Sequence, residues 1–160
     1  NLSLNDPATQ QTWVAQFRQL GIAPARLLWE GFTPTTAYLK SYQQIDIALD
    51  SFPFNGATTT CAALWMGVPV VTLVGEKHAS RMGLSILSAA GLTELIAYTP
   101  AEFVKICVRL ANDIEGLHNL RQGMRERLQS SPLLDASSYT RNLEVVYRQM
   151  WEKWCQQVRN

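Results

Sequence analysis

The order of elements is decided by residues 45–74, which read IDIALDSFPFNGATTTCAALWMGVPVVTLV. Residues 45–49 form a short β-branched apolar run, and residues 68–74 form the strongest strand candidate in the chain. Between them, a loop with Pro and Gly leads into a helix expected over residues 58–67. Apolar strands joined by a helix are typical of a parallel sheet that is covered on both faces. The stretch therefore predicts a βαβ unit.

The same alternation continues on both sides of this stretch. We expect helices over residues 7–21, 33–42, 79–90 and from 99 onward, with short extended segments at 26–29 and 95–97. Asp6-Pro7 and Thr99-Pro100 are pairs of a capping residue and a proline, which commonly start helices. From Thr99 the pattern is helical only. The sequence thus predicts a Rossmann-like α/β domain with a parallel sheet over residues 1–130 and a C-terminal helical tail over residues 131–160.

Composition excludes several classes of protein. Of the 160 residues, 47% are hydrophobic, which is enough for a real core, and the net charge of +1 argues against a general nucleic-acid surface. No apolar run approaches the roughly 18 residues needed to span a bilayer. The three cysteines are widely spaced and only two histidines are present, so neither a disulfide framework nor a metal site is predicted. We expect a cytoplasmic protein and, because the chain begins at Asn1 without Met, a piece of a longer one.

The strand-to-helix loop that precedes Thr58 is the first candidate site, because open parallel sheets bind ligands beyond the carboxyl ends of their strands. Asn55-Gly56 permits a tight turn with positive φ, and Thr58, Thr59 and Thr60 open the helix. The first N–H groups of a helix lack intrahelical partners, and the helix dipole is positive there. A diphosphate needs such convergent donors. Threonine also caps helices generally, so a capped helix without a ligand remains the alternative.

Two other segments contain candidate residues. Residues 75–81 follow the best strand and include His78, but a lone histidine without a named partner is weak evidence for a base. Tyr38 could offer its ring to a nucleobase, although a helical tyrosine is more often half-buried packing. We interpret Trp65 as a core or interface residue and the charges of residues 121–127 as a solvated helix face.

Residues 55–72 resemble the C-terminal catalytic lobe of O-linked N-acetylglucosaminyltransferases and SPINDLY-like glycosyltransferases. The likeness is supported by residues 46–50, 75–76, 79–81, 131–133 and 147–151, and it runs in order over nearly the whole chain. The resemblance implies a GT-B enzyme, with two Rossmann-like lobes usually preceded by tetratricopeptide repeats. This chain would be the second lobe, which binds the UDP-sugar, and the helix within 131–160 would pack on it or on the N-terminal lobe.

The resemblance also implies roles for individual residues. Asn55, Gly56, Thr58, Thr59 and Thr60 would hold the UDP diphosphate, Tyr38 would lie against uracil, and Thr33 and Pro34 would line the base pocket through their backbone. Catalytic residues and the acceptor groove would lie in the N-terminal lobe, so none is assigned here. The resemblance implies neither a metal nor a cofactor, since the UDP-sugar is the donor substrate.

The leading hypothesis is the donor lobe of a protein O-glycosyltransferase, which transfers a sugar, N-acetylglucosamine by resemblance, from UDP to Ser or Thr. On this hypothesis the isolated chain is folded but inactive. The alternative is a degenerate lobe that serves as a protein-interaction module, since Ala57 and Ala62 stand where relatives have a histidine and a ribose-binding carboxylate. Transfer of glucose, or of fucose from a guanosine donor, also remains open.

Overall fold

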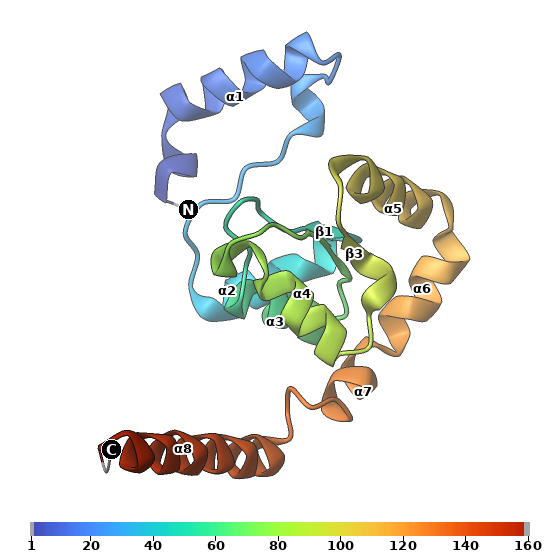
Figure 1. Cartoon of the computed structure of the whole chain (residues 1–160). Coiled ribbons are helices and arrows are strands. Elements are labelled where there is room, and N and C mark those ends of the chain that lie inside the picture. Colours follow the sequence, from blue (N-terminus) through green and yellow to red (C-terminus); the bar gives the residue numbers. More distant parts are fainter. Residues whose placement is uncertain (1, 159–160) are drawn as a thin grey trace. The chain divides into compact units, whose positions relative to one another are not determined.

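The computed structural model describes residues 2–158 and divides the chain into two compact units, Asn1–Ser41 and Tyr42–Asn160 (Figure 1). The first unit contains helices α1 (Pro7–Gln19) and α2 (Thr35–Ser41), with short 3-10 turns at Leu2–Asn5 and Pro24–Arg26. Asp6 caps α1, because its carboxylate accepts hydrogen bonds of 2.8 Å from the amide and from the hydroxyl of Thr9. These bonds lower the pKa of Asp6. The predicted start of this helix is confirmed.

The short extended segment predicted at residues 26–29 does not form a strand. Pro24–Arg26 forms a 3-10 turn that ends with a 3.0 Å hydrogen bond from the amide of Leu27 to the carbonyl of Pro24. A strand needs a neighbouring strand for its backbone hydrogen bonds, and the described part of the first unit contains none. Leu28 is accordingly 88% exposed.

The second unit is built on three parallel strands in the order β1 (Ala48–Leu49), β2 (Val70–Leu73) and β3 (Ile96–Ala97). Ala48 pairs with Val70, and Thr72 pairs with Ile96. Helices α3 (Thr58–Trp65) and α4 (Met82–Ala89) connect the strands. The predicted parallel α/β sheet is therefore confirmed, although its strands are shorter than predicted.

The core lies around β2. Helices α3, α4 and α5 (Pro100–Asn112) all pack against this strand, and Val70, Val71 and Thr72 are buried in succession. Successive strand residues point to opposite faces, so both faces of the sheet are covered. Leu64 and Leu87, from α3 and α4, are fully buried, and each such side chain contributes roughly 1.5–3 kcal/mol.

The segment after β3 is helical throughout, as predicted. Helix α5 starts with a reciprocal capping box between Thr99 and Glu102, and it is followed by α6 (Ile114–Gln122), α7 (Met124–Gln129) and α8 (Ala136–Val158). Helix α8 is continuous and contains no buried residue (Figure 1). The boundary at residue 130 and the surface on which the tail packs stay predictions. Within residues 2–158, no helix has both the length and the apolar character that crossing a membrane requires.

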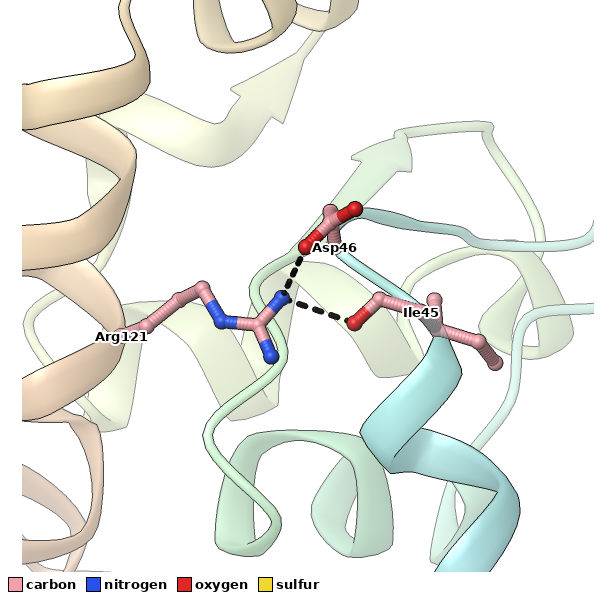
Figure 2. A network of polar contacts seen from close by, with 3 residues as sticks. All are labelled: Ile45, Asp46 and Arg121. Atoms are coloured by element: carbon pink, nitrogen blue, oxygen red, sulfur yellow. Dashed lines mark hydrogen bonds and ion pairs between the residues drawn. The ribbon is translucent and has the colours of Figure 1, made fainter.

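The charges of residues 121–127 are largely exposed, as predicted for a solvated face, but two of the arginines also bind backbone carbonyls of distant segments. Arg121 of α6 donates hydrogen bonds of 2.7 Å to the carbonyl of Ile45 and 3.0 Å to the carboxylate of Asp46 (Figure 2). Arg125 donates two bonds of 3.1 Å to the carbonyl of Trp65, and its guanidinium lies 5.2 Å from the ring of Trp65. The last carbonyls of a helix lack intrahelical hydrogen-bond donors. At the end of α3, Arg125 supplies a donor for the carbonyl of Trp65.

Candidate functional site

Two loops leave the sheet at the carboxyl ends of neighbouring strands. Residues 50–57 follow β1, and residues 74–81 follow β2. Because these strands are parallel, both loops begin at one edge of the sheet. The amide of Asn55 donates a 2.9 Å hydrogen bond to the carbonyl of Ala79, which joins the loops. The structure thus brings the predicted diphosphate loop and the second candidate loop together.

The N-terminus of α3 has no side-chain cap, and its first residues are exposed. The residue at its N-cap position is Ala57, which offers no side-chain hydrogen bond. The helices α4 and α7 also begin without a side-chain cap, whereas α1, α5 and α6 are capped by Asp6, Thr99 and Asp113. Thr58 and Thr59 are exposed. Helical geometry leaves the first amides of α3 without intrahelical partners. The exposure of Thr58 and Thr59 is compatible with the predicted convergence of amide and hydroxyl donors, and binding of a diphosphate there stays a prediction.

Thr60 occupies a different position from its two neighbours. Its side chain is buried, and its hydroxyl donates a 2.9 Å hydrogen bond to the carbonyl of Gly56. This hydroxyl therefore holds the loop in place, and only the amide of Thr60 is left for a ligand.

Gly56 is required for space and not for its backbone conformation. The predicted positive φ is wrong, because Gly21, Gly67 and Gly91 are the described residues that have one. A Cβ atom at Gly56 would lie 2.3 Å from the hydroxyl oxygen of Thr59 and 2.9 Å from that of Thr60. The small residue thus lets both threonines approach the turn.

The buried side chain of Asn55 stabilises the loop. Its side chain is 1% exposed, and its amide nitrogen donates a 2.9 Å hydrogen bond to the carbonyl of Ser51. Its Oδ1 atom is buried and has no hydrogen-bond partner among the described residues. A buried acceptor without a partner costs free energy, roughly 1–3 kcal/mol.

The surface is hollowed on both flanks of α3. One hollow, of about 400 Å³, is lined by Thr59 together with Asp50 and Ser51 at the end of β1. The other, of about 360 Å³, is lined by Ala62 and Cys61 of α3 and by apolar residues that include Leu134. Partial burial raises the pKa of Cys61, so its thiol stays protonated at neutral pH. The start of α3 therefore lies between a hollow of mixed polar and apolar lining and an apolar one.

The residues predicted to bind the base belong to the first unit. Thr33 and Pro34 directly precede α2, and the amide of Tyr38 donates a 2.9 Å hydrogen bond to the carbonyl of Pro34. The ring of Tyr38 is half-buried. The contact of these residues with a nucleobase stays a prediction.

The most connected polar side chain of the loop was not predicted to have a role. Asp50 accepts hydrogen bonds of 2.7 Å from the amide of Gly56 and from the hydroxyl of Thr72. An acidic residue at the end of a strand is a visible signal in the sequence. Its partner Thr72 lies on another strand, however, and the sequence pattern does not reveal that pairing.

Comparison with known proteins agrees with this architecture. Residues 4–143 match the sequence model described as glycosyl transferase family 41. A solved structure of a mutant Thermobaculum terrenum O-GlcNAc transferase has a TM-score of 0.89 and 41% identity, and it covers 97% of this chain and 30% of that one.

Curated relatives show the same likeness. A probable UDP-N-acetylglucosamine–peptide N-acetylglucosaminyltransferase SPINDLY from Solanum lycopersicum is 40% identical over 149 residues, which cover 92% of this chain and 16% of the relative. A UDP-N-acetylglucosamine–peptide N-acetylglucosaminyltransferase from Caenorhabditis elegans is 36% identical over 134 residues, which cover 84% of this chain and 12% of the relative. This chain thus spans a small part of these proteins. This chain therefore belongs to glycosyl transferase family 41, and its Rossmann-like α/β fold matches part of a solved member.

Proposed function

We propose that this chain is the nucleotide-sugar-binding lobe of a protein O-glycosyltransferase that transfers N-acetylglucosamine from UDP to Ser or Thr. The names of the relatives from Solanum lycopersicum and Caenorhabditis elegans support this donor and a peptide acceptor. The observation that carries the proposal is the uncapped N-terminus of α3, where the exposed residues Thr58 and Thr59 follow Ala57. Amides at a helix N-terminus favour a bound phosphate group.

In this mechanism the lobe binds the donor and stabilises the leaving group. The amides at Thr58, Thr59 and Thr60 would face the diphosphate oxygens, on which negative charge grows as the bond to the sugar breaks. Hydroxyls of Thr58 and Thr59 add donors. Asn55 and Gly56 shape the loop, while Thr33, Pro34 and Tyr38 would bind the uracil.

The remaining parts of the enzyme are also proposals. An N-terminal lobe would supply the acceptor groove and the acid–base groups, and tetratricopeptide repeats would precede it. The described cysteines Cys61, Cys107 and Cys155 are all unpaired, which is typical of a reducing compartment and supports a cytoplasmic location. On this proposal no metal holds the diphosphate, so UDP binding should be unchanged by EDTA. Loss of UDP binding in EDTA would contradict this part of the proposal.

A calorimetric titration of the full-length protein with UDP tests the donor site. The wild type should bind UDP saturably, and the double variant Thr58→Val/Thr59→Val should bind at least about tenfold more weakly, since it loses two hydroxyl donors. Thr140→Val, an exposed threonine of α8, is the matched control and should bind as the wild type does. Equal affinity of all three proteins would contradict the proposal. A parallel titration with GDP tests the guanosine donor.

A protein-interaction module is the second candidate function. The apolar hollow lined by Ala62, Trp65 and Leu133 favours it, because an apolar surface suits a protein partner. In addition, relatives are expected to carry a ribose-binding carboxylate where this chain has Ala62. If the lobe binds UDP, Ala62→Asp should tighten binding by supplying that acceptor. If it is an interaction module, neither the wild type nor Ala62→Asp should bind millimolar UDP.

A further inference from the structure

Asp50 ties together three segments around the open helix N-terminus. It directly follows β1, and its Oδ1 atom accepts a 2.7 Å hydrogen bond from the amide of Gly56, two residues before α3. Its Oδ2 atom accepts a second bond of 2.7 Å from the hydroxyl of Thr72, which is fully buried in β2. Both oxygens of the carboxylate are therefore engaged, one by the loop and one by the central strand.

We propose that Asp50 is a positioning residue, which through Gly56 sets the direction of the α3 amides that receive the nucleotide diphosphate. The inference rests on the proposed function, because it assigns a role in the same donor site. Asp50 does not itself touch the ligand. It fixes the donors before the ligand arrives, which lowers the cost of ordering the loop on binding.

The loop geometry explains why this anchor matters. Gly56 is held on both sides, since its amide donates to Asp50 and its carbonyl accepts the 2.9 Å hydrogen bond from Thr60. Only Ala57 separates Gly56 from the first residue of α3, and Ala57 has no side-chain hydrogen bond of its own. The two bonds at Gly56 therefore decide how the chain enters the helix. Bonds to an ionised carboxylate are short and about twice as strong as neutral ones.

Gly83 gives an independent way to disturb this anchor. A Cβ atom there would lie 2.1 Å from the hydroxyl oxygen of Thr72 and 2.6 Å from Oδ2 of Asp50. Gly83 lies in α4, away from the Thr58–Thr60 sequence. Gly83→Ala should thus displace the Asp50–Thr72 pair while every residue of the donor loop keeps its identity.

The test compares UDP with uridine, which lacks the diphosphate, in the full-length protein. UDP affinity is measured by calorimetry and uridine affinity by ligand-observed NMR. Asp50→Ala should weaken UDP binding about tenfold, the effect of losing a hydrogen bond to a charged group, and leave uridine binding unchanged. Asp50→Asn, which keeps one acceptor, should recover part of the loss. Thr72→Ser should bind as the wild type does, whereas Thr72→Val and Gly83→Ala should weaken UDP alone.

The outcomes separate this inference from the proposed function. If the wild type binds neither UDP nor uridine, the donor site itself is wrong, and the inference fails with it. Suppose instead that the wild type binds UDP and that Asp50→Ala is folded. The positioning role alone is then overturned if Asp50→Ala has the UDP affinity of the wild type, or if its affinities for UDP and uridine fall equally. Should Asp50→Ala fail to fold, the UDP affinities of Thr72→Val and Thr72→Ser are compared instead. Equal UDP affinities of these two variants would overturn the positioning role.

Discussion

The hydroxyl of Thr72 donates a 2.7 Å hydrogen bond to Oδ2 of Asp50, across 22 positions of the sequence. This bond joins the middle strand to the residue that follows its neighbour β1. Through the other oxygen of Asp50, the link extends to Gly56 and so to the start of α3. The candidate donor site is thereby fixed to the most buried part of the sheet.

Substitution by valine should lower the stability of the protein at Thr60 and its affinity for UDP at Thr59. Thr60→Val removes the buried donor to Gly56 and should lower the free energy of unfolding by about 1 kcal/mol. Thr59→Val changes an exposed side chain and should alter stability by less than about 0.5 kcal/mol while it weakens UDP binding. Urea unfolding and UDP titration of both variants check this. Equal stability losses would contradict the distinct roles.

Arg121 should matter more for stability than its ion pair suggests. Arg121→Met removes the 2.7 Å bond to the carbonyl of Ile45 and should cost about 1.5 kcal/mol of unfolding free energy. Asp46→Asn removes only the surface charge of the 3.0 Å pair and should cost less than about 0.5 kcal/mol. Urea unfolding of both variants measures the difference. A larger loss in Asp46→Asn would show that the ion pair is the important contact.

Local features of this fold could be predicted from the sequence. The starts of α1 and α5 depend on side chains within three residues, so Asp6-Pro7 and Thr99-Pro100 reveal them. The Thr-rich loop could be placed at the carboxyl edge of a parallel sheet because the strand–helix order alone decides that position. These rules need no knowledge of distant contacts.

The features that could not be predicted depend on distant partners. Asp50 meets Thr72 and Arg121 meets Ile45 only after the sheet and α6 have packed. The apolar pattern of residues 26–29 suggests a strand, but β structure also requires a neighbour, and the described first unit has none. The burial of Thr60 likewise depends on the path of the loop around Gly56.

The isolated 160-residue chain should bind the donor without transferring sugar. The groups that would activate the acceptor are expected outside this chain, which spans 16% of the Solanum lycopersicum relative. Incubation with labelled UDP-N-acetylglucosamine and a Ser/Thr peptide checks this, with the full-length protein as the positive control. Measurable transfer by the isolated chain would contradict the division of labour between lobes.

The isolated chain should self-associate through α8. Tyr147, Met150 and Trp154 are each more than half exposed, and the rings of Trp151 and Trp154 stack at 5.2 Å. Such an apolar stripe favours burial against another surface. Met150→Glu/Trp154→Glu should give a monomer in sizing chromatography, while the exposed control Gln149→Glu should not. A monomeric wild type at high concentration would contradict this expectation.

The most direct measurement is a crystal structure of the full-length protein with UDP bound. We expect diphosphate oxygens within hydrogen-bond distance, roughly 2.7–3.2 Å, of the amides that open α3 at Thr58 and Thr59. We also expect the Asp50–Gly56 bond to persist in the complex. A structure in which the diphosphate binds elsewhere, with the N-terminus of α3 facing only water, would contradict the central claim.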